Sequence, residues 1–103
     1  MQGIPAEGFA GTDALDQWLS TNNQFEAILT PEPGATIISP TVGNNHGHVG
    51  IIGQYDLQYK KDWGIISNDS NTGIVREQWS YTGWRDYYRV ALGLSIHIYR
   101  RIA

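Results

Sequence analysis

His48 and Asn68 are the two side chains whose types and positions best suit chemistry. The segment Gly47-His48-Val49-Gly50 puts His48 at the head of a short apolar run, which predicts a buried strand starting at this histidine. There its orientation is fixed and its pKa can be tuned near neutrality, as a general base requires. The next apolar run ends at Asn68, so a hairpin between the runs would let Asn68 bond the second ring nitrogen. From spacing alone, the simpler alternative of a strand histidine without a chemical role is favoured over this base and orienting residue, and both stay open.

Metal and hydroxyl chemistry fit the residue types less well. His46 and His48 share one side-chain phase, but a zinc site needs three or four protein ligands, and only Asp56 or Asp69 could complete it. Thr12 is explained better as a helix N-cap than as a nucleophile. The chain has no cysteine, which excludes disulfides, thiolate metal sites and a cysteine nucleophile within it. We therefore expect no metal and no cofactor.

Aromatic residues gather in the second half of the chain, which has most of the four Trp and six Tyr residues. The simpler interpretation is that a small domain uses large side chains to bury enough area. The alternative is a groove whose rings stack on a ligand, with Trp63, Trp84 and Tyr87 as the substrate-binding residues.

The elements that must position these residues are one helix and a set of short strands. The helix follows Thr12 as its N-cap and carries an apolar stripe of Leu15, Trp18 and Leu19. Strands are expected at 36–39, 46–52, 63–67, 74–79 and, most clearly from its alternation, 92–98. His97 lies on the polar phase of the last strand and is expected at the surface or as a filler of the sheet face. This pattern predicts an α+β fold, an N-terminal helix followed by an antiparallel β-meander of four to five strands.

Length and charge limit the class of protein. The 103 residues fit a single domain, with residues 1–11 as an arm or loop. The net charge is −3, and all seven basic residues follow residue 54 without a cluster beyond Lys60-Lys61 and Arg100-Arg101, so nucleic acid is not an expected partner. No apolar run is long enough to cross a membrane, and the first residues lack the features of a signal peptide, which leaves localisation open.

Several segments, taken in order, have the form of a known family. They are Pro33-Gly34 before a β-prone run, Gly47-His48-Val49-Gly50-Ile51, Ser67-Asn68, and the stretch from Trp84 to Tyr87. This order, within residues 12–100, resembles the papain-like peptidoglycan hydrolases of the CHAP and NlpC kind, which cleave peptide or amide bonds. The resemblance implies His48 as the base, Asn68 as the orienting residue, a partial papain-like fold, and peptidoglycan peptide or glycan as partner.

The chain departs from that family in two places. Ala35 replaces the usual acid after Pro-Gly, and the nucleophilic cysteine, which begins an upstream helix, is missing. We therefore expect a cell-wall amidase or endopeptidase-like domain that is truncated or inactive as given, either incomplete at its start or a pseudoenzyme. The alternative is a non-catalytic module that binds cell-wall glycan or peptide through an aromatic face.

The missing nucleophile helix also leads to an expectation about assembly. Without that helix, the strands Thr36–Ser39, Val49–Ile52 and Trp63–Ile66 would expose a contiguous apolar surface. Monomers rarely leave such a surface bare. A symmetric homodimer that buries the two bare faces is the simplest cover.

Overall fold

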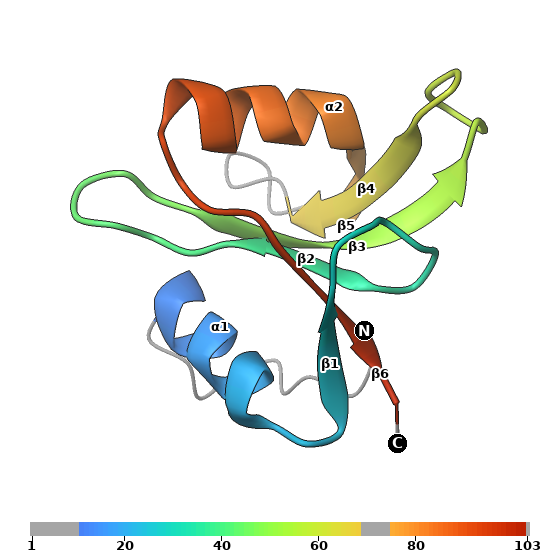
Figure 1. The fold of residues 1–103 in the computed structure, drawn as a ribbon. Coiled ribbons are helices and arrows are strands. Elements are labelled where there is room, and N and C mark those ends of the chain that lie inside the picture. The colour runs from blue at the N-terminus through green and yellow to red at the C-terminus, as the bar shows by residue number, and fades with distance from the viewer. Residues whose placement is uncertain (1–10, 69–74, 103) are drawn as a thin grey trace.

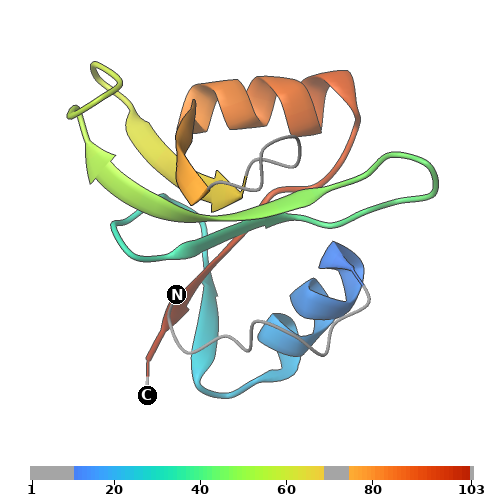
Figure 2. The same ribbon diagram turned by 180° about the vertical axis from the view of Figure 1, so that it is seen from behind.

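The fold consists of an antiparallel sheet with helices packed on both of its faces (Figures 1 and 2). The computed structural model describes residues 11–68 and 75–102. The expected arm, apart from Gly11, and most of the expected turn at 68–73 lie outside the described residues. The expected α+β class is confirmed.

The helices come from opposite ends of the chain. Helix α1, Thr12–Thr21, packs on one face of the sheet. Helix α2, Tyr81–Trp84, continues directly into the π-helical segment η1, Arg85–Ala91, and the two together cover the other face. Among the described residues, no helix combines the length and apolar character needed to cross a membrane.

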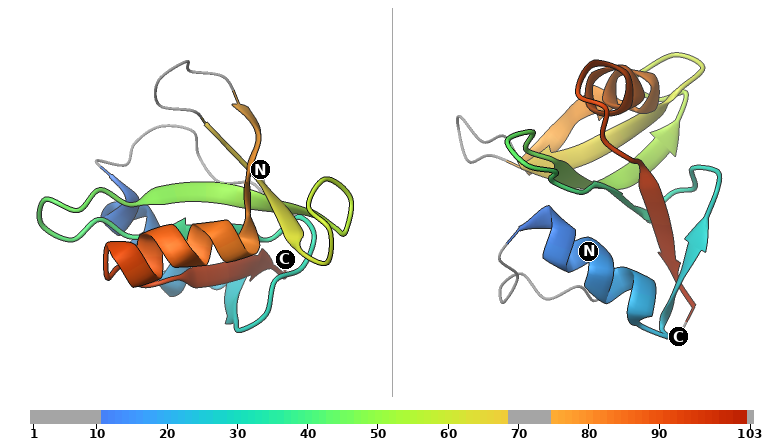
Figure 3. Two further views of the ribbon diagram at one scale, coloured as in Figure 1. Left: turned by 90° about the horizontal axis from the view of Figure 1, so that it is seen from above. Right: turned by 60° about the vertical axis from the view of Figure 1, so that its left-hand side comes forward.

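Within the described residues, six strands form one sheet in the order β1-β6-β2-β3-β4-β5. The strands are β1 Phe25–Ile28, β2 Thr36–Ser39, β3 His48–Tyr55, β4 Trp63–Asn68, β5 Val75–Ser80 and β6 His97–Arg101. Strands β2 to β5 form the expected meander, but β6 returns to pair with both β2 and β1 (Figure 3). The expected simple meander is therefore wrong: β1 is an additional strand, and the last strand lies between the first two.

Two apolar cores, one on each sheet face, explain why β2 is apolar along its whole length. Successive strand residues point to opposite faces, so Ile37 and Ile38 reach different cores. The core under α2 and η1 is built from Ala35, Ile37, Ile52, Ile65, Trp84, Tyr88, Leu94 and Ile98. The core under α1 is built from Leu15, Leu19, Phe25, Ile38 and Tyr99. Because helices cover both faces of β2, all four of its residues are buried.

The N-terminal helix agrees with expectation except at its cap. Leu15 and Leu19 are buried against the sheet, as their spacing predicts. Gly11, not Thr12, occupies the N-cap position, and no side chain caps the helix there. The Thr12 hydroxyl instead accepts a hydrogen bond from the Thr41 backbone N–H at 2.8 Å. Thr12 thus fastens α1 to the segment that follows β2.

The strand expected at 92–98 is wrong over most of its length, because β6 begins only at His97. The Leu94 N–H donates to the Tyr88 carbonyl at 2.8 Å, so this backbone closes the end of η1 and does not join the sheet. The apolar side chains of the stretch still point into the core under η1, which is why its pattern resembles that of a strand.

The apolar surface expected over three strands is mostly covered by the two helical layers. The residues of these strands that are fully or almost fully buried include all of β2, Ile52 and Ile65. On the α1 side of the sheet, three aliphatic side chains stay half-buried: Val49, Ile51 and Ile66. The structure thus reduces the apolar surface from which a homodimer is expected, and the dimer itself stays a prediction.

Asp16 ties α1 to β6 through two side chains. Its Oδ1 accepts a hydrogen bond from the Tyr99 hydroxyl at 2.8 Å and lies 2.8 Å from His97 Nδ1. Burial and the hydrogen bond to Asp16 raise the pKa of Tyr99, so the hydroxyl stays protonated and donates. His97, expected as a surface residue, is thus part of a polar cluster between helix and sheet.

We expect Asp16→Ala to lower the free energy of unfolding by about 1–3 kcal/mol, because the buried Tyr99 hydroxyl would lose its acceptor. Urea unfolding followed by tryptophan fluorescence measures this loss. Asp13→Ala is the matched control, since Asp13 is exposed in the first turn of the same helix, and it should cost less than about 1 kcal/mol. Equal losses in the two variants would contradict a specific role for the Asp16 cluster.

Candidate functional site

His48 is the first residue of β3, and its ring lies in an aromatic stack. In the register of β2 and β3, His48 pairs with Ser39. The Ser39 hydroxyl accepts a hydrogen bond from Trp84 Nε1 at 3.0 Å, so this pair of residues faces α2. The His48 ring centroid lies 5.7 Å from that of Trp84 and 6.3 Å from that of Tyr88, with interplanar angles of 23° and 24°. The orientation of the imidazole is therefore set by two rings from the helical layer.

Two glycines explain the spacing of residues around His48. A Cβ atom on Gly47 would lie 1.7 Å from the Ser39 carbonyl oxygen, and one on Gly50 would lie 2.6 Å from Ile65 Cγ2. Neither glycine has a positive φ, so close packing and not backbone conformation requires them. The segment Gly-His-Val-Gly is thus the local sequence that lets β3 lie between β2 and β4 with the histidine at its start.

Burial favours a neutral His48. Desolvation lowers the pKa of His48 from its ordinary value of 6.5, and a hydrogen bond to the Asn68 backbone opposes this shift in part. Because that bond favours the protonated form, the backbone group is the carbonyl, and a ring N–H donates to it. In a neutral imidazole with one N–H, the other nitrogen is an acceptor. That nitrogen is able to take a proton from an acid placed beside it.

The Asn68 backbone, and not its side chain, contacts the His48 ring. In the register of β3 and β4, Gly50 pairs with Ser67. Gly50 and His48 share one face of β3, so Ser67 shares it too, and the next side chain, that of Asn68, alternates to the other face. The expectation that the Asn68 amide orients the ring is therefore wrong. The Asn68 backbone carbonyl contacts the ring instead. A register shifted by one residue would be needed to put the Asn68 side chain on the His48 face.

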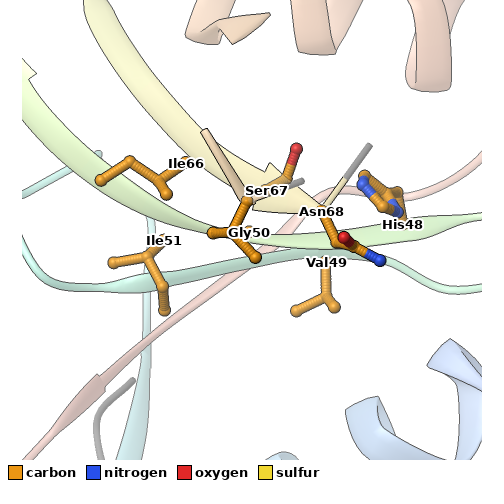
Figure 4. Close-up of a pocket in the computed structure, with 8 residues that line it drawn as sticks. His48, Val49, Gly50, Ile51, Ile66, Ser67 and Asn68 are labelled. Atoms are coloured by element: carbon orange, nitrogen blue, oxygen red, sulfur yellow. The ribbon is translucent and has the colours of Figure 1, made fainter. Parts of the chain in front are cut away.

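A pocket of about 450 Å³ opens beside His48. It is lined by His48, Val49, Gly50, Ile51, Ile66, Ser67, Asn68 and Val75. Figure 4 shows His48 and Ser67 on one side of the β3 ribbon and Val49 and Ile51 on the other. The aliphatic wall of the pocket is thus the half-buried sheet surface on the side away from α2. An apolar wall with few polar groups, at this volume, is typical of a site for a small ligand.

The three aromatic residues expected to bind substrate occupy different environments. Trp84 is fully buried, so it offers no ring face to a ligand and supports His48 instead. Tyr87 is 46% exposed, and its ring packs 4.9 Å from that of Tyr88. Trp63 packs against Tyr55 at the far end of the β3–β4 hairpin. The structure thus brings Trp84 and Tyr87 into the aromatic group around His48, whereas Trp63 packs against the same core with its ring on Tyr55.

Sequence reasoning missed two buried polar side chains beside His48. Burial, together with the neighbouring Tyr87, raises the pKa of Tyr88 to about 12, so its hydroxyl is neutral. Ser67 is buried on the His48 face and accepts a hydrogen bond from Gln78 Nε2 at 2.9 Å. The Ser67-Asn68 dipeptide indicates a polar residue near His48. Only the strand register shows that the Ser67 side chain, and not that of Asn68, lies on the His48 face.

Asp56, one of the two acids considered for a metal, follows the end of β3 opposite to the end where His48 begins the strand. No group of three or more His, Cys, Asp and Glu side chains in the described part of the chain could hold a metal ion. Asp56 Oδ1 accepts a hydrogen bond from the Lys61 backbone N–H in the β3–β4 loop, and Asp69 lies outside the described residues.

We expect Gly47→Ala to lower the free energy of unfolding by about 1–3 kcal/mol or more, because the new methyl group would overlap the Ser39 carbonyl. Gly53→Ala is the matched control in β3, the strand that directly follows Gly47, since its Cβ would lie 3.4 Å from the nearest atom. Its free energy of unfolding should change by less than about 1 kcal/mol. Chemical denaturation of both variants checks the difference, and a harmless Gly47→Ala would refute the packing requirement.

We expect His48 to make folding less stable in acid. Its pKa is lower in the folded state than in the unfolded chain, so the unfolded state binds more protons as the pH falls through and below 6.5. The contribution of His48 to the free energy of unfolding is therefore fully present above pH 6.5, and it falls as the pH drops below this value. Urea unfolding at pH 5 and pH 7.5 should show a smaller pH dependence for His48→Gln than for the natural chain. Nitrogen-15 NMR should show a neutral His48 ring at pH 7, and a His48 midpoint above 6.5 would contradict the structure.

Comparison with known proteins adds no family to this description. No protein-family model matches the chain, and no curated protein or solved structure matches it at a significant level. What the chain does is therefore inferred from the geometry around His48 and from the residue types themselves.

Proposed function

We propose that this chain supplies the general base and part of the substrate pocket of a peptidoglycan amidase or endopeptidase-like domain. One observation carries this proposal: His48 is a desolvated imidazole, stacked on Trp84, with one ring nitrogen hydrogen-bonded to the Asn68 carbonyl. Its other nitrogen is an acceptor on the α2 face of the sheet, and His48 also lines the edge of a pocket whose aliphatic wall lies on the opposite face. The resemblance of residues 47–51 to the cell-wall hydrolases supports the same class.

The chemistry of this class needs a thiol as well as a base. The histidine takes the proton of a cysteine thiol, and the thiolate attacks the amide carbonyl carbon to form a tetrahedral intermediate. The histidine then returns the proton to the leaving amine, and water hydrolyses the resulting thioester. The chain contains no cysteine, so it contributes the base and its surroundings and is proposed to be inactive by itself.

The surroundings of His48 suit the part of a base. The Asn68 carbonyl fixes which ring nitrogen has the proton, as an orienting acceptor does in other nucleophile–histidine systems. Trp84 and Tyr88 remove water from one side of the ring and keep its pKa below the ordinary value. A base that is unprotonated at neutral pH is ready to accept a proton without a prior ionisation step.

The pocket beside His48 matches a short peptide better than a bare sugar. Its wall of Val49, Ile51 and Ile66 is aliphatic, which suits a small aliphatic side chain next to the reacting amide. Polar groups are available only at the His48 and Asn68 end.

A non-catalytic module that binds cell-wall glycan or peptide is the second candidate. The exposed ring of Tyr87 favours it, because this ring lies 5.6 Å from that of Trp79 and forms an aromatic surface on η1. Such a surface suits stacking on a sugar ring. This function requires no base and no thiol.

We expect no hydrolysis of peptidoglycan or of small amide substrates by the chain alone. Without a thiolate, His48 has no nucleophile to activate, and a serine or threonine would need its own base and oxyanion donors. Release of soluble fragments from purified peptidoglycan measures this. Turnover that disappears in His48→Ala would overturn the prediction and indicate a hydroxyl nucleophile.

Ligand binding tests the proposed function directly. NMR titration should use a disaccharide-pentapeptide, the free pentapeptide and chitotetraose as separate probes. We expect the two peptide-containing probes to shift resonances of His48, Val49 and Ile66, and Val49→Asp to abolish those shifts. Val90→Asp, on the exposed side of η1, is the control. Shifts caused by chitotetraose alone, centred on Tyr87, would favour the binding module, and no shift with any probe would reject both functions.

A further inference from the structure

The loop between β3 and β4 is a rigid projection at the end of the hairpin farthest from His48 (Figures 1 and 3). We refer to residues 55–63, which include the loop and its two flanking strand residues, as the hairpin tip. The Asp56 N–H donates to the Asp62 carbonyl at 2.8 Å, and the Asp62 carboxylate accepts from the backbone N–H groups of Trp63 and Thr82 at 2.8 and 3.1 Å. These bonds hold the loop in one shape and tie it to the start of α2.

Backbone strain accompanies this shape. Asp56 and Lys61 have φ angles of 57° and 58°, a region that costs free energy for residues other than glycine. The Asp56 carboxylate accepts a hydrogen bond from the Lys61 N–H, which helps to hold both residues there. The loop is therefore held in its shape before any ligand arrives, which lowers the entropy lost on binding.

The hairpin tip displays apolar rings next to two lysine ammonium groups, and its formal net charge is balanced by two aspartates. Tyr55 is 52% exposed and Leu57 65% exposed, and the Tyr55 ring packs edge-on against Trp63 at 5.3 Å. Lys60 and Lys61 are exposed, and within the described residues neither ammonium group has an ion-pair partner. Both carboxylates of the tip accept backbone N–H groups, as described above. The two lysines are therefore the charged side chains of the tip that no described group engages, while both carboxylates are held by backbone N–H groups.

We propose that the hairpin tip binds an anionic saccharide chain. Sugar rings would pack on the Tyr55 and Trp63 surface, and acidic groups of the chain would pair with Lys60 and Lys61. The partner class rests on the proposed function, since a cell-wall enzyme acts beside such polymers.

Four probes test this proposal on the chain as it is. They are hyaluronan hexasaccharide (anionic sugar rings), chitohexaose (neutral sugar rings), polyglutamate (charge without sugar rings) and phosphatidylglycerol vesicles. We expect the hyaluronan fragment to shift NMR resonances of residues 55–63 most strongly, and its affinity to fall as salt rises because exposed charges are screened. Stronger binding to polyglutamate or to vesicles than to hyaluronan would overturn the proposal.

Variants assign the contacts. Replacing Lys60 and Lys61 together by Ala should weaken hyaluronan binding about fivefold to tenfold, and Tyr55→Ala should weaken it about fivefold. The control replaces Arg89 and Val90 by Ala, two exposed residues of η1 outside the tip, and should leave affinity unchanged. Unchanged affinity in the lysine variant would reject the proposal.

The two proposals fail separately. Saturable shifts at 55–63 with hyaluronan, without peptide-induced shifts at His48, would keep the saccharide site and reject the base. The reverse pattern would keep the base and reject the saccharide site. Each site thus has its own probe and its own variant.

Discussion

The hydrogen bond from the Trp84 indole to the Ser39 hydroxyl is the contact on which the His48 site depends. Both residues are fully buried, and they come from α2 and β2, 45 positions apart in the chain. Loss of either partner would leave a buried polar group unsatisfied, so the pair specifies one orientation of the indole. His48, directly across from Ser39, then has a fixed ring to stack on. The same contact thus fixes the position of α2 on β2 and, through the Trp84 ring, the orientation of His48.

The sheet divides into a local half and a half that joins the two ends of the chain. Strands β2 to β5 are sequential hairpins, and the residues of the candidate site come from them and from the helix that follows. Strand β6 instead pairs with β1 and β2, where Arg100 forms an ion pair with Glu26 and the Ile102 N–H donates to the Gln24 carbonyl. Asp16 adds a link from α1. The site therefore sits on locally formed hairpins, while long-range pairing closes the sheet beside it.

The sequence predicts the parts of this fold that depend on local chemistry. The apolar stripe of α1, the strand at 36–39 and the start of β3 at His48 follow from periodicity and from glycine and proline signals, and the structure contains all three. At the two glycines around His48, a Cβ atom would overlap a neighbouring strand, so these positions require the absence of a side chain. These features are predictable because they depend on residues that are close in the sequence, or on a position that has no side chain.

The features that the sequence does not predict depend on distant partners. The position of β6 between β1 and β2 is decided by pairs of residues 59 to 76 positions apart in the chain. The alternating apolar side chains just before β6 are buried under η1 and do not belong to a strand. The sheet face that the Asn68 side chain occupies depends on the register between β3 and β4. A shift of one residue would move this side chain to the other face, and no local sequence signal determines the register. Thr12 is a good cap by type, yet the Thr41 N–H competes for its hydroxyl. In each case a tertiary contact overrides a valid local preference.

Strand β3 joins the two sites proposed for this protein. It runs from His48 to Tyr55, and at about 3.3 Å per residue these ends are at most about 23 Å apart. The register shifts between Ile52 and Tyr55, which increases the local twist and turns the end of the hairpin away from the plane of the pocket. A polymer held at the hairpin tip would stay within reach of His48 without occupying the pocket. Binding at one end of a rigid strand would thereby raise the effective concentration of peptide at the other.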